Sequence, residues 1–215
     1  DFSPLLKAIN YSMTSFIGTG GTRGSKKSVT KFYPRSFNMG ISRKVYETIG
    51  DMGGLRHGQD MDYSARIYKA GFKVGLIEKA YVYHKRRTSL WKFFKQIFNW
   101  GVARINLSRM HPELLKPIHL APAVLVIALV GILVLGASIG WLFEALTLLG
   151  FGYLLLGILV TIQSFLWYKL IPVSLLSILT ITIQILAYGF GLLYALIQVA
   201  IGKNEAKGFV KHYYK

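Results

Sequence analysis

Three long apolar stretches in the second half of the chain constrain its fold more than any other feature. They cover residues 117–138, 141–166 and 171–201. In this region Glu144 and Lys169 are the only residues with charged side chains at neutral pH. A membrane span needs about 20 predominantly apolar residues, and each stretch is long enough. A buried core of a soluble protein rarely needs three such stretches in succession. We therefore predict three membrane-spanning helices.

The third stretch is longer than one span requires. It is compatible with one tilted helix, or with an interfacial turn that leads into a helix. Gly189 and Gly191 lie within it. Small residues of this kind allow two helices to approach closely, so we expect both glycines at helix contacts.

Basic residues near the ends of the spans predict the orientation, because Lys and Arg concentrate on the cytoplasmic side. Arg104, Arg109 and Lys116 precede the first span, and Lys169 follows the second. This places the front half of the chain in the cytoplasm. The basic tail contains Lys203, Lys207, Lys211 and Lys215. After three spans it would lie outside, so either the last segment does not cross fully or the tail is an exception to the rule.

The composition excludes some chemistry. The chain has 215 residues, a formal net charge of +17 and no cysteine. Disulfides, thiolate zinc sites and a cysteine nucleophile are therefore excluded. The chain starts at Asp1 and has no signal segment, and we expect it to be a fragment that lacks its N-terminal part. The glycine-rich segment 18–28 matches no phosphate-binding motif in register, and we interpret it as a flexible basic loop.

The front half has the pattern of a mixed α/β domain. Residues 36–41, 72–77 and 80–84 are predicted to form strands, the last of which ends at His84. A helix is predicted from Ser42, its N-cap, to Gly50. A second helix is predicted over 62–70, with Gly71 as its terminator.

Residues 89–109 are predicted to form an amphipathic helix. Apolar side chains recur there at helical spacing. Lys92, Lys95, Arg104 and Arg109 lie among them. We expect this helix to lie on the bilayer surface and to lead into the first span.

Asp60 and Asp62 stand one residue apart in a basic setting, "RHGQDMDYSARIYKAG", residues 56–71. Both can be read as carboxylates at a helix N-terminus that balance Arg56 and Arg66. The alternative is that Asp60 is a general base, since a positioned carboxylate can take a proton from a nucleophile, while Asp62 organises the start of the helix.

The order of three motifs resembles a known family. They are "SFNMGISRKVYETIG", "GQDMDYSARIYKAGFKVGLIEKAYVYHKR" and "FFKQIFNWG", and apolar spans follow them. This order resembles the C-terminal, acceptor-side half of membrane-bound family-2 glycosyltransferases, the inverting GT-A enzymes, of the exopolysaccharide or lipid-linked glycan type. The resemblance covers about residues 15–194. It implies a partial GT-A domain over 1–88, an interface helix over 89–116, transmembrane helices over 117–201 and a basic tail over 202–215.

The resemblance also implies roles for individual residues. Asp60 corresponds to the catalytic base, with Gln59 in place of the usual Glu. His84 stands where the family has a ligand of the divalent cation, Mg²⁺ or Mn²⁺, although a histidine that ends a strand is often structural. Arg86 and Arg87 would neutralise the donor diphosphate. The alternative is that they face lipid head groups.

"QIFNW", residues 96–100, is similar to the QxxRW motif of processive members of the family. We assign Gln96 and Trp100 to the acceptor site on this resemblance. Asn99 replaces the arginine, which favours a transferase that adds a single sugar. Alternatively, Trp100 is an interfacial anchor, a common role of tryptophan near a bilayer.

The resemblance implies a glycosyltransferase that moves a sugar from a nucleotide-sugar donor to a lipid-linked or growing glycan acceptor. Such an enzyme is a multi-pass protein of the inner membrane with a cytoplasmic catalytic domain, and lipid is a further partner. The family's donor half with its DxD motif is absent, because the only D-x-D of the chain, Asp60-Met61-Asp62, has surroundings that match the acceptor motif. We therefore expect the fragment alone to be inactive. The alternative is a non-enzymatic membrane protein whose basic domain binds anionic lipid or a partner. No nucleic-acid motif is present, and we expect no nucleic-acid partner.

Overall fold

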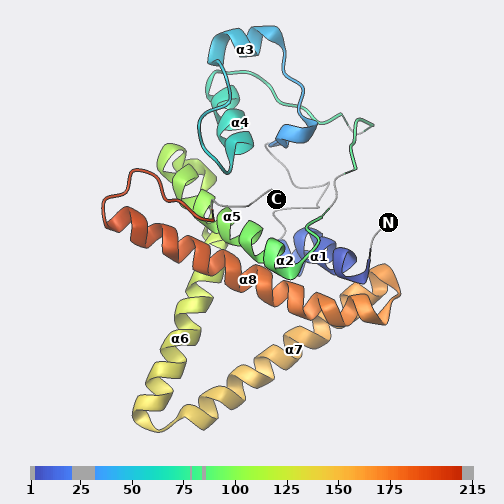
Figure 1. The fold of residues 1–215 in the computed structure, drawn as a ribbon, viewed down its shortest axis with the longest axis vertical. Helices are drawn as coiled ribbons and strands as arrows, with labels where there is room; N and C mark the ends of the chain where they lie inside the picture. The colour runs from blue at the N-terminus through green and yellow to red at the C-terminus, as the bar shows by residue number, and fades with distance from the viewer. Residues whose placement is uncertain (1–2, 21–31, 78, 84–85, 210–215) are drawn as a thin grey trace.

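The computed structural model describes residues 3–20, 32–77, 79–83 and 86–209, and every regular element in these ranges is a helix (Figure 1). The α-helices are α1 Pro4–Thr14, α2 Phe16–Thr19, α3 Arg43–Ile49, α4 Gln59–Lys69, α5 Leu90–Met110, α6 Ala121–Ile139, α7 Leu142–Tyr168 and α8 Ile171–Ala200. Short 3₁₀ helices cover Ser36–Asn38, Pro112–Leu114 and Pro117–His119.

The predicted α/β fold, a partial GT-A domain, is therefore wrong for the described part of the chain. Residues 36–38 form a 3₁₀ helix, and residues 72–77 have no strand assignment. Backbone hydrogen bonds near this segment are local, from Phe72 N to Ile67 O and from Ala80 N to Ile77 O. Strand identity requires a ladder of hydrogen bonds to a neighbour. The alternating sequence predicted a strand, but no partner strand lies among the described residues.

Two predicted helices of the front half are confirmed. Ser42 caps α3, since its Oγ accepts a hydrogen bond from the Val45 N–H at 3.4 Å, and Gly50 ends the helix with φ 71°. Helix α4 starts at Gln59, three residues before the predicted start, because Gly58 precedes it in a left-handed conformation with φ 86°. The two helices pack through a small core of Val45, Tyr63 and Ile67.

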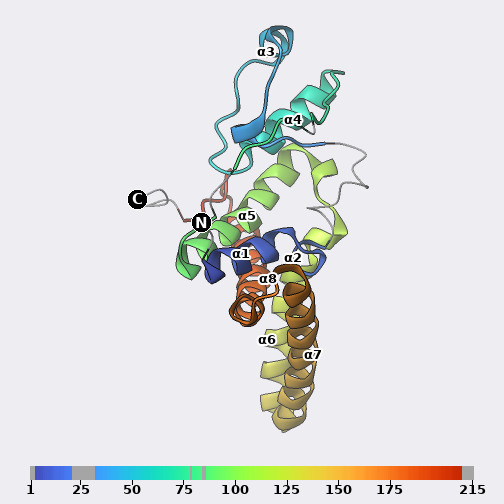
Figure 2. The same ribbon diagram turned by 90° about the vertical axis from the view of Figure 1, so that its right-hand side faces the viewer.

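Below this unit, α1, α5 and α8 pack together in a group that we call the layer, in which α1 and α5 lie on the upper side of α8 (Figures 1 and 2). Helix α5 lies alongside the C-terminal half of α8, and α1 lies alongside the N-terminal half. The apolar stripe of α5 is buried in this layer; it includes Phe93, Ile97, Val102 and Ile105. The sequence predicts that this stripe lies on lipid. In the structure it packs on α1 and α8, because these helices offer a complementary apolar face.

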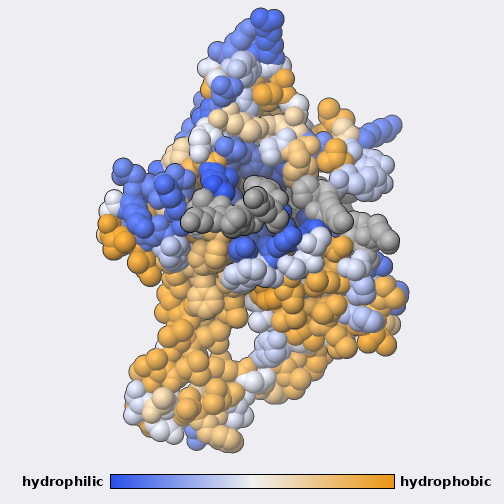
Figure 3. Space-filling model, viewed as in Figure 1, coloured by the Kyte–Doolittle hydropathy of each residue, from blue (hydrophilic) through white to orange (hydrophobic). Residues whose placement is uncertain are grey.

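The three apolar segments are confirmed as helices that are long and apolar enough to cross a membrane. Helices α6 and α7 project together from the layer, whereas α8 runs across their upper ends (Figures 1 and 2). The projecting part of the surface is almost wholly hydrophobic, and the part around α3 and α4 is largely hydrophilic (Figure 3). This division is typical of a membrane protein.

Glycines allow α8 to approach its neighbours, as the sequence predicted for Gly189 and Gly191. A Cβ atom on Gly191 would collide with the carbonyl oxygen of Phe98 in α5, and one on Gly189 would lie 2.5 Å from the carbonyl oxygen of Pro122 in α6. Gly101 of α5 makes the reciprocal approach to the backbone of α8 at Tyr188. Backbone therefore packs on backbone where α5 crosses α8.

This packing predicts that Gly191→Ala destabilises the protein. The new methyl group has no space, and overpacking of this kind costs about 1–3 kcal/mol. Gly131→Ala in α6 is the matched control, since a Cβ there meets nothing within 4 Å. The control should gain about 0.5–1 kcal/mol from helix propensity. Thermal unfolding in detergent measures both variants, and equal melting temperatures would contradict the packing.

Candidate functional site

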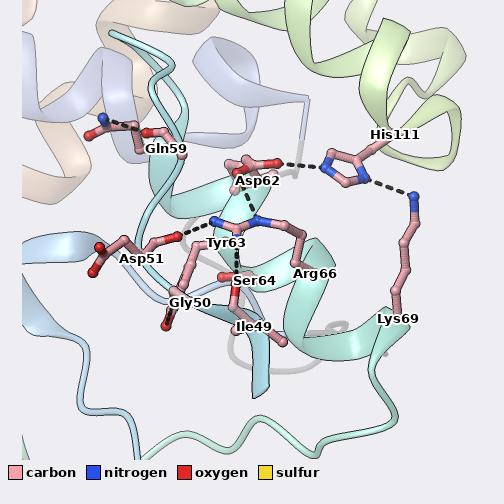
Figure 4. Close-up of polar contacts among 12 residues, drawn as sticks. Ile49, Gly50, Asp51, Gln59, Asp62, Tyr63, Ser64, Arg66, Lys69 and His111 are labelled. Carbon is pink, nitrogen blue, oxygen red and sulfur yellow. Dashed lines mark hydrogen bonds and ion pairs between the residues drawn. The ribbon is translucent and has the colours of Figure 1, made fainter. Parts of the chain in front are cut away.

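The two neighbouring aspartates of α4 have different environments. Asp62 has only 1% of its side chain exposed. Its Oδ2 accepts a hydrogen bond from Arg66 Nε at 3.1 Å, and its Oδ1 lies 2.8 Å from Nε2 of His111, at the end of α5 (Figure 4). Arg66 also donates to the carbonyl oxygens of Ile49 and Asp51. Asp62 therefore joins α4 to α5 and, through Arg66, to the end of α3.

The hydrogen bonds of His111 define its tautomer. Lys69 Nζ lies 2.9 Å from Nδ1 of His111 (Figure 4). An ammonium group only donates, so Nδ1 accepts and the ring proton sits on Nε2, which donates to Asp62. The chain from Lys69 through His111 to Asp62 is thus satisfied internally. Asp62 and His111 are buried and hold the site together, whereas the side chain of Lys69 is 53% exposed and also pairs with Glu113 at 3.5 Å.

Asp60 is the accessible carboxylate of the pair. Its side chain is 17% exposed, and Oδ2 forms an ion pair with Arg35 Nη1 at 3.2 Å. Its Oδ1 accepts a hydrogen bond from the backbone N–H of Met61 at 3.0 Å. Asp60 also lies in the first turn of α4, where the helix dipole favours a negative charge. These contacts hold the carboxylate in a fixed, partly exposed position.

Basic residues lie near His57, in the loop just before α4. Burial lowers the pKa of His57, and the charges of Arg56 and Arg87 lower it further. The imidazole is therefore neutral at neutral pH. Arg87 is close enough to act on His57, three residues before Asp60. Together with Arg35, these arginines give the start of α4 a field that attracts anions.

The start of α4 lies against one face of α5. A Cβ on Gly58 would meet Leu107 Cδ1 at 2.8 Å, and Ala65 of α4 packs with Leu107 in one cluster. Trp100 precedes Leu107 by seven residues, so the two share a helix face and lie about 10 Å apart along the axis. Gln96 extends the same face by another turn. Gln96 and Trp100 are both half-buried, and Trp100 packs partly against the cluster of Ile9 and Ile97.

Arg86 and Arg87 have different surroundings. Arg86 Nε and Nη2 donate to Asn10 Oδ1 of α1 at 3.0 and 2.9 Å. Asn10 in turn donates to the hydroxyl of Tyr168 at 2.9 Å. Burial lowers the pKa of the Arg86 guanidinium. The structure thus ties Arg86 to α1 and the end of α7, while Arg87 acts near α4.

Asn99 has a structural role that the motif comparison missed. Its side chain is fully buried. Its Oδ1 accepts from the backbone N–H of Phe209 at 2.8 Å, and its Nδ2 donates to the carbonyl oxygen of Phe209 at 3.1 Å. An asparagine between apolar residues on the buried side of a helix was the available signal. Arg35 and His111 were also missed, because their partners are distant in sequence.

The predicted metal ligand His84 lies outside the described residues. Within the described ranges, no group of three or more His, Asp or Glu side chains is placed to hold a metal ion. The oxygen atoms of Asp60 and Asp62 are engaged by Arg35, Arg66 and His111. These donors do not form a divalent-cation site by themselves.

No protein-family model, curated protein or solved structure matches this chain.

The contrast between the two aspartates predicts different effects on stability. Asp62→Asn removes the charge that pairs with Arg66 in a buried position, and the loss of one partner of such a pair costs about 3 kcal/mol. Asp60→Asn loses a partly exposed ion pair, which contributes about 0–1 kcal/mol. Denaturant or thermal unfolding of the two variants measures the difference. An Asp60 variant that is the less stable of the two would contradict these assignments.

Proposed function

We propose that this chain is the acceptor-side part of a membrane-bound glycosyltransferase. The observation that carries the proposal is Asp60, a fixed and accessible carboxylate on the first turn of α4. Gly58, just before the helix, lies against Leu107 of α5, about 10 Å along that helix from Trp100. The motif order that resembles inverting family-2 glycosyltransferases supports the same role.

In this proposal Asp60 is the general base for an inverting transfer. The acceptor hydroxyl donates its proton to an Asp60 oxygen while its own oxygen forms a bond to the anomeric carbon of the donor sugar. The bond between that carbon and the phosphate oxygen breaks, and the nucleoside diphosphate leaves with the electron pair. Arg35 orients the carboxylate, since its guanidinium lies 3.2 Å from Oδ2.

The basic residues near α4 fit an anionic donor. We assign Arg87 to the donor diphosphate, because its charge already acts on the loop before α4. Arg86 would help only by leaving its hydrogen bonds to Asn10. A divalent cation, Mg²⁺ or Mn²⁺, remains part of the proposal for the complete enzyme. The described residues do not fit such an ion by themselves, so no step is assigned to it.

Trp100 and Gln96 are proposed to contact a lipid-linked or glycan acceptor. Their face of α5 belongs to the layer from which α6 and α7 project (Figure 1). A lipid-linked sugar at the level of the head groups would therefore be near Asp60. We place this site on the cytoplasmic face of the inner membrane, because the basic residues before α6 favour that side.

Asp60→Asn in the full-length protein tests the proposal. Loss of a positioned general base should lower turnover by roughly two to four orders of magnitude. Donor binding should change little, because asparagine keeps the shape of the side chain. Arg43→Gln in α3 is a control for charge, since Arg43 pairs with Glu47 in an exposed position. If sugar transfer persists in the Asp60 variant at the rate of the control, Asp60 is not the base. If anionic lipid binds and no transfer occurs in the unmodified protein, the non-enzymatic alternative holds.

Trp100 provides a second test. Trp100→Ala should raise the acceptor KM and change the donor Kd little. The rise in KM should correspond to about 1–3 kcal/mol of lost acceptor binding if stacking on a sugar resembles stacking on a base. Trp100→Phe should recover part of the loss. Kinetics at varied acceptor concentration and donor titration separate the two effects. An unchanged acceptor KM in both variants would leave Trp100 with only a packing role.

A further inference from the structure

Helix α8 has a polar face that is covered by protein along most of its length. In the N-terminal half, Thr180 Oγ1 accepts from Ser12 Oγ of α1 at 2.6 Å and donates to the carbonyl oxygen of Ala8 at 3.1 Å. Gln184 Nε2 donates to the carbonyl oxygen of Ser12 at 2.9 Å. Apolar side chains such as Leu175, Leu179 and Ile197 point away from the protein and are exposed.

The C-terminal half of α8 runs alongside α5 in the same direction. Phe93 and Ile97 pack against Ala187, whereas Val102 and Ile105 pack further along, against Leu192 and Ala195. Any tilt of α8 through a membrane would therefore tilt α5 with it. The charged side chains of α5 are Lys92, Lys95, Arg104 and Arg109, spread over its whole length. Such residues inside a bilayer are costly, so α5 cannot follow α8 across the hydrocarbon layer.

The segment after α8 turns back and runs along α5. Asn106 Oδ1 accepts from the Ala206 N–H at 3.0 Å and its Nδ2 donates to the Ala206 carbonyl at 2.9 Å, the same double contact that Asn99 makes with Phe209. Asn106 follows Asn99 by seven positions in the helix, and their partners Ala206 and Phe209 are three positions apart in the tail. Both intervals span about 10 Å, because an extended chain rises about 3.3 Å per residue and a helix 1.5 Å.

Two further side chains hold the same segment. Gln198 accepts from the Lys207 N–H at 3.2 Å and donates to the Lys207 carbonyl at 3.1 Å. Arg109 Nη1 donates to the carbonyl oxygen of Asn204 at 2.6 Å. Residues 203–209 are thus fixed along α5 from its C-terminal end to Asn99. They lie on the same side of the membrane as α5.

From these contacts we infer that the chain between α5 and its tail crosses the membrane only twice, through α6 and α7. Helix α8 lies in the plane of the membrane at the head-group boundary. Its apolar face contacts lipid, and α1, α5 and the tail cover its polar face. An even number of crossings puts Lys203 and Lys207 on the same side as Lys116 and Lys169, which agrees with the rule for basic residues. The inference does not depend on the proposed enzymatic function.

Single-cysteine labelling tests the number of crossings, since the chain has no cysteine of its own. The variants are Lys44→Cys in α3, Ala137→Cys near the end of α6 and Glu205→Cys in the tail, all at exposed positions. Intact cells are treated with a membrane-impermeant maleimide and compared with permeabilised cells. Glu205→Cys should behave like Lys44→Cys and opposite to Ala137→Cys. Labelling of Glu205→Cys together with Ala137→Cys, or of all three alike, would overturn the inference.

The depth of α8 in the bilayer is an independent test. Fluorophores on Leu175→Cys and Ile197→Cys, both exposed, lie about 33 Å apart along the helix. Lipids brominated at defined depths should quench both equally. Phe143→Cys and Leu166→Cys on α7 form the matched pair, about as far apart and also exposed. If the α8 pair differs in depth as much as the α7 pair, α8 crosses the membrane and the inference fails.

Discussion

The fold depends on how the polar face of α8 is satisfied. A helix that carries Thr180, Gln184 and Gln198 among apolar residues needs hydrogen-bond partners for them, since unpaired polar groups are costly away from water. Helix α1 supplies partners for Thr180 and for the side-chain nitrogen of Gln184, whose oxygen is buried with no partner among the described residues, and the backbone of the tail supplies them for Gln198. The same contacts bring α1, α5 and α8 into one layer, with glycine backbone against helix backbone at Gly101 and Gly191. The remaining helices are arranged around this layer.

The layer determines where the proposed site lies. Helix α5 ends at His111, whose imidazole holds the buried Asp62 of α4. Asp60, two residues earlier, is thereby fixed near the place where Gly58 and Ala65 pack on Leu107 of α5. Both aspartates lie in the first turn of α4, but Asp62 is buried and Asp60 is partly exposed. The site therefore rests on a rigid base that lies next to the apolar hairpin of α6 and α7 (Figure 1).

The sequence predicted most of the long helices, because their signals are local, but α1, Pro4–Thr14, was not predicted. Ser42 and Gly50 mark the ends of α3, and the long apolar runs mark α6, α7 and α8. The predicted strands are wrong because a strand needs a neighbouring strand to pair with, and the periodicity of one segment does not show whether such a neighbour exists. The sequence identified Asp60 as the candidate base. It did not predict the ion pair with Arg35, because the two residues are 25 apart in the sequence. Asn99 was compared with an arginine of a motif, although its actual partner is Phe209, 110 residues away.

Protein covers the polar face of α8, and for this reason an apolar segment of this length need not cross a membrane. Length and composition alone qualify it as a span. Its neighbours argue against this, because α5 brings charged residues along its side. A structure of the full-length protein in a lipid nanodisc would test this arrangement most directly. We expect α6 and α7 to pass through the disc and α8 to lie along its surface beside α5. Density for α8 that crosses the disc from one face to the other would contradict the account.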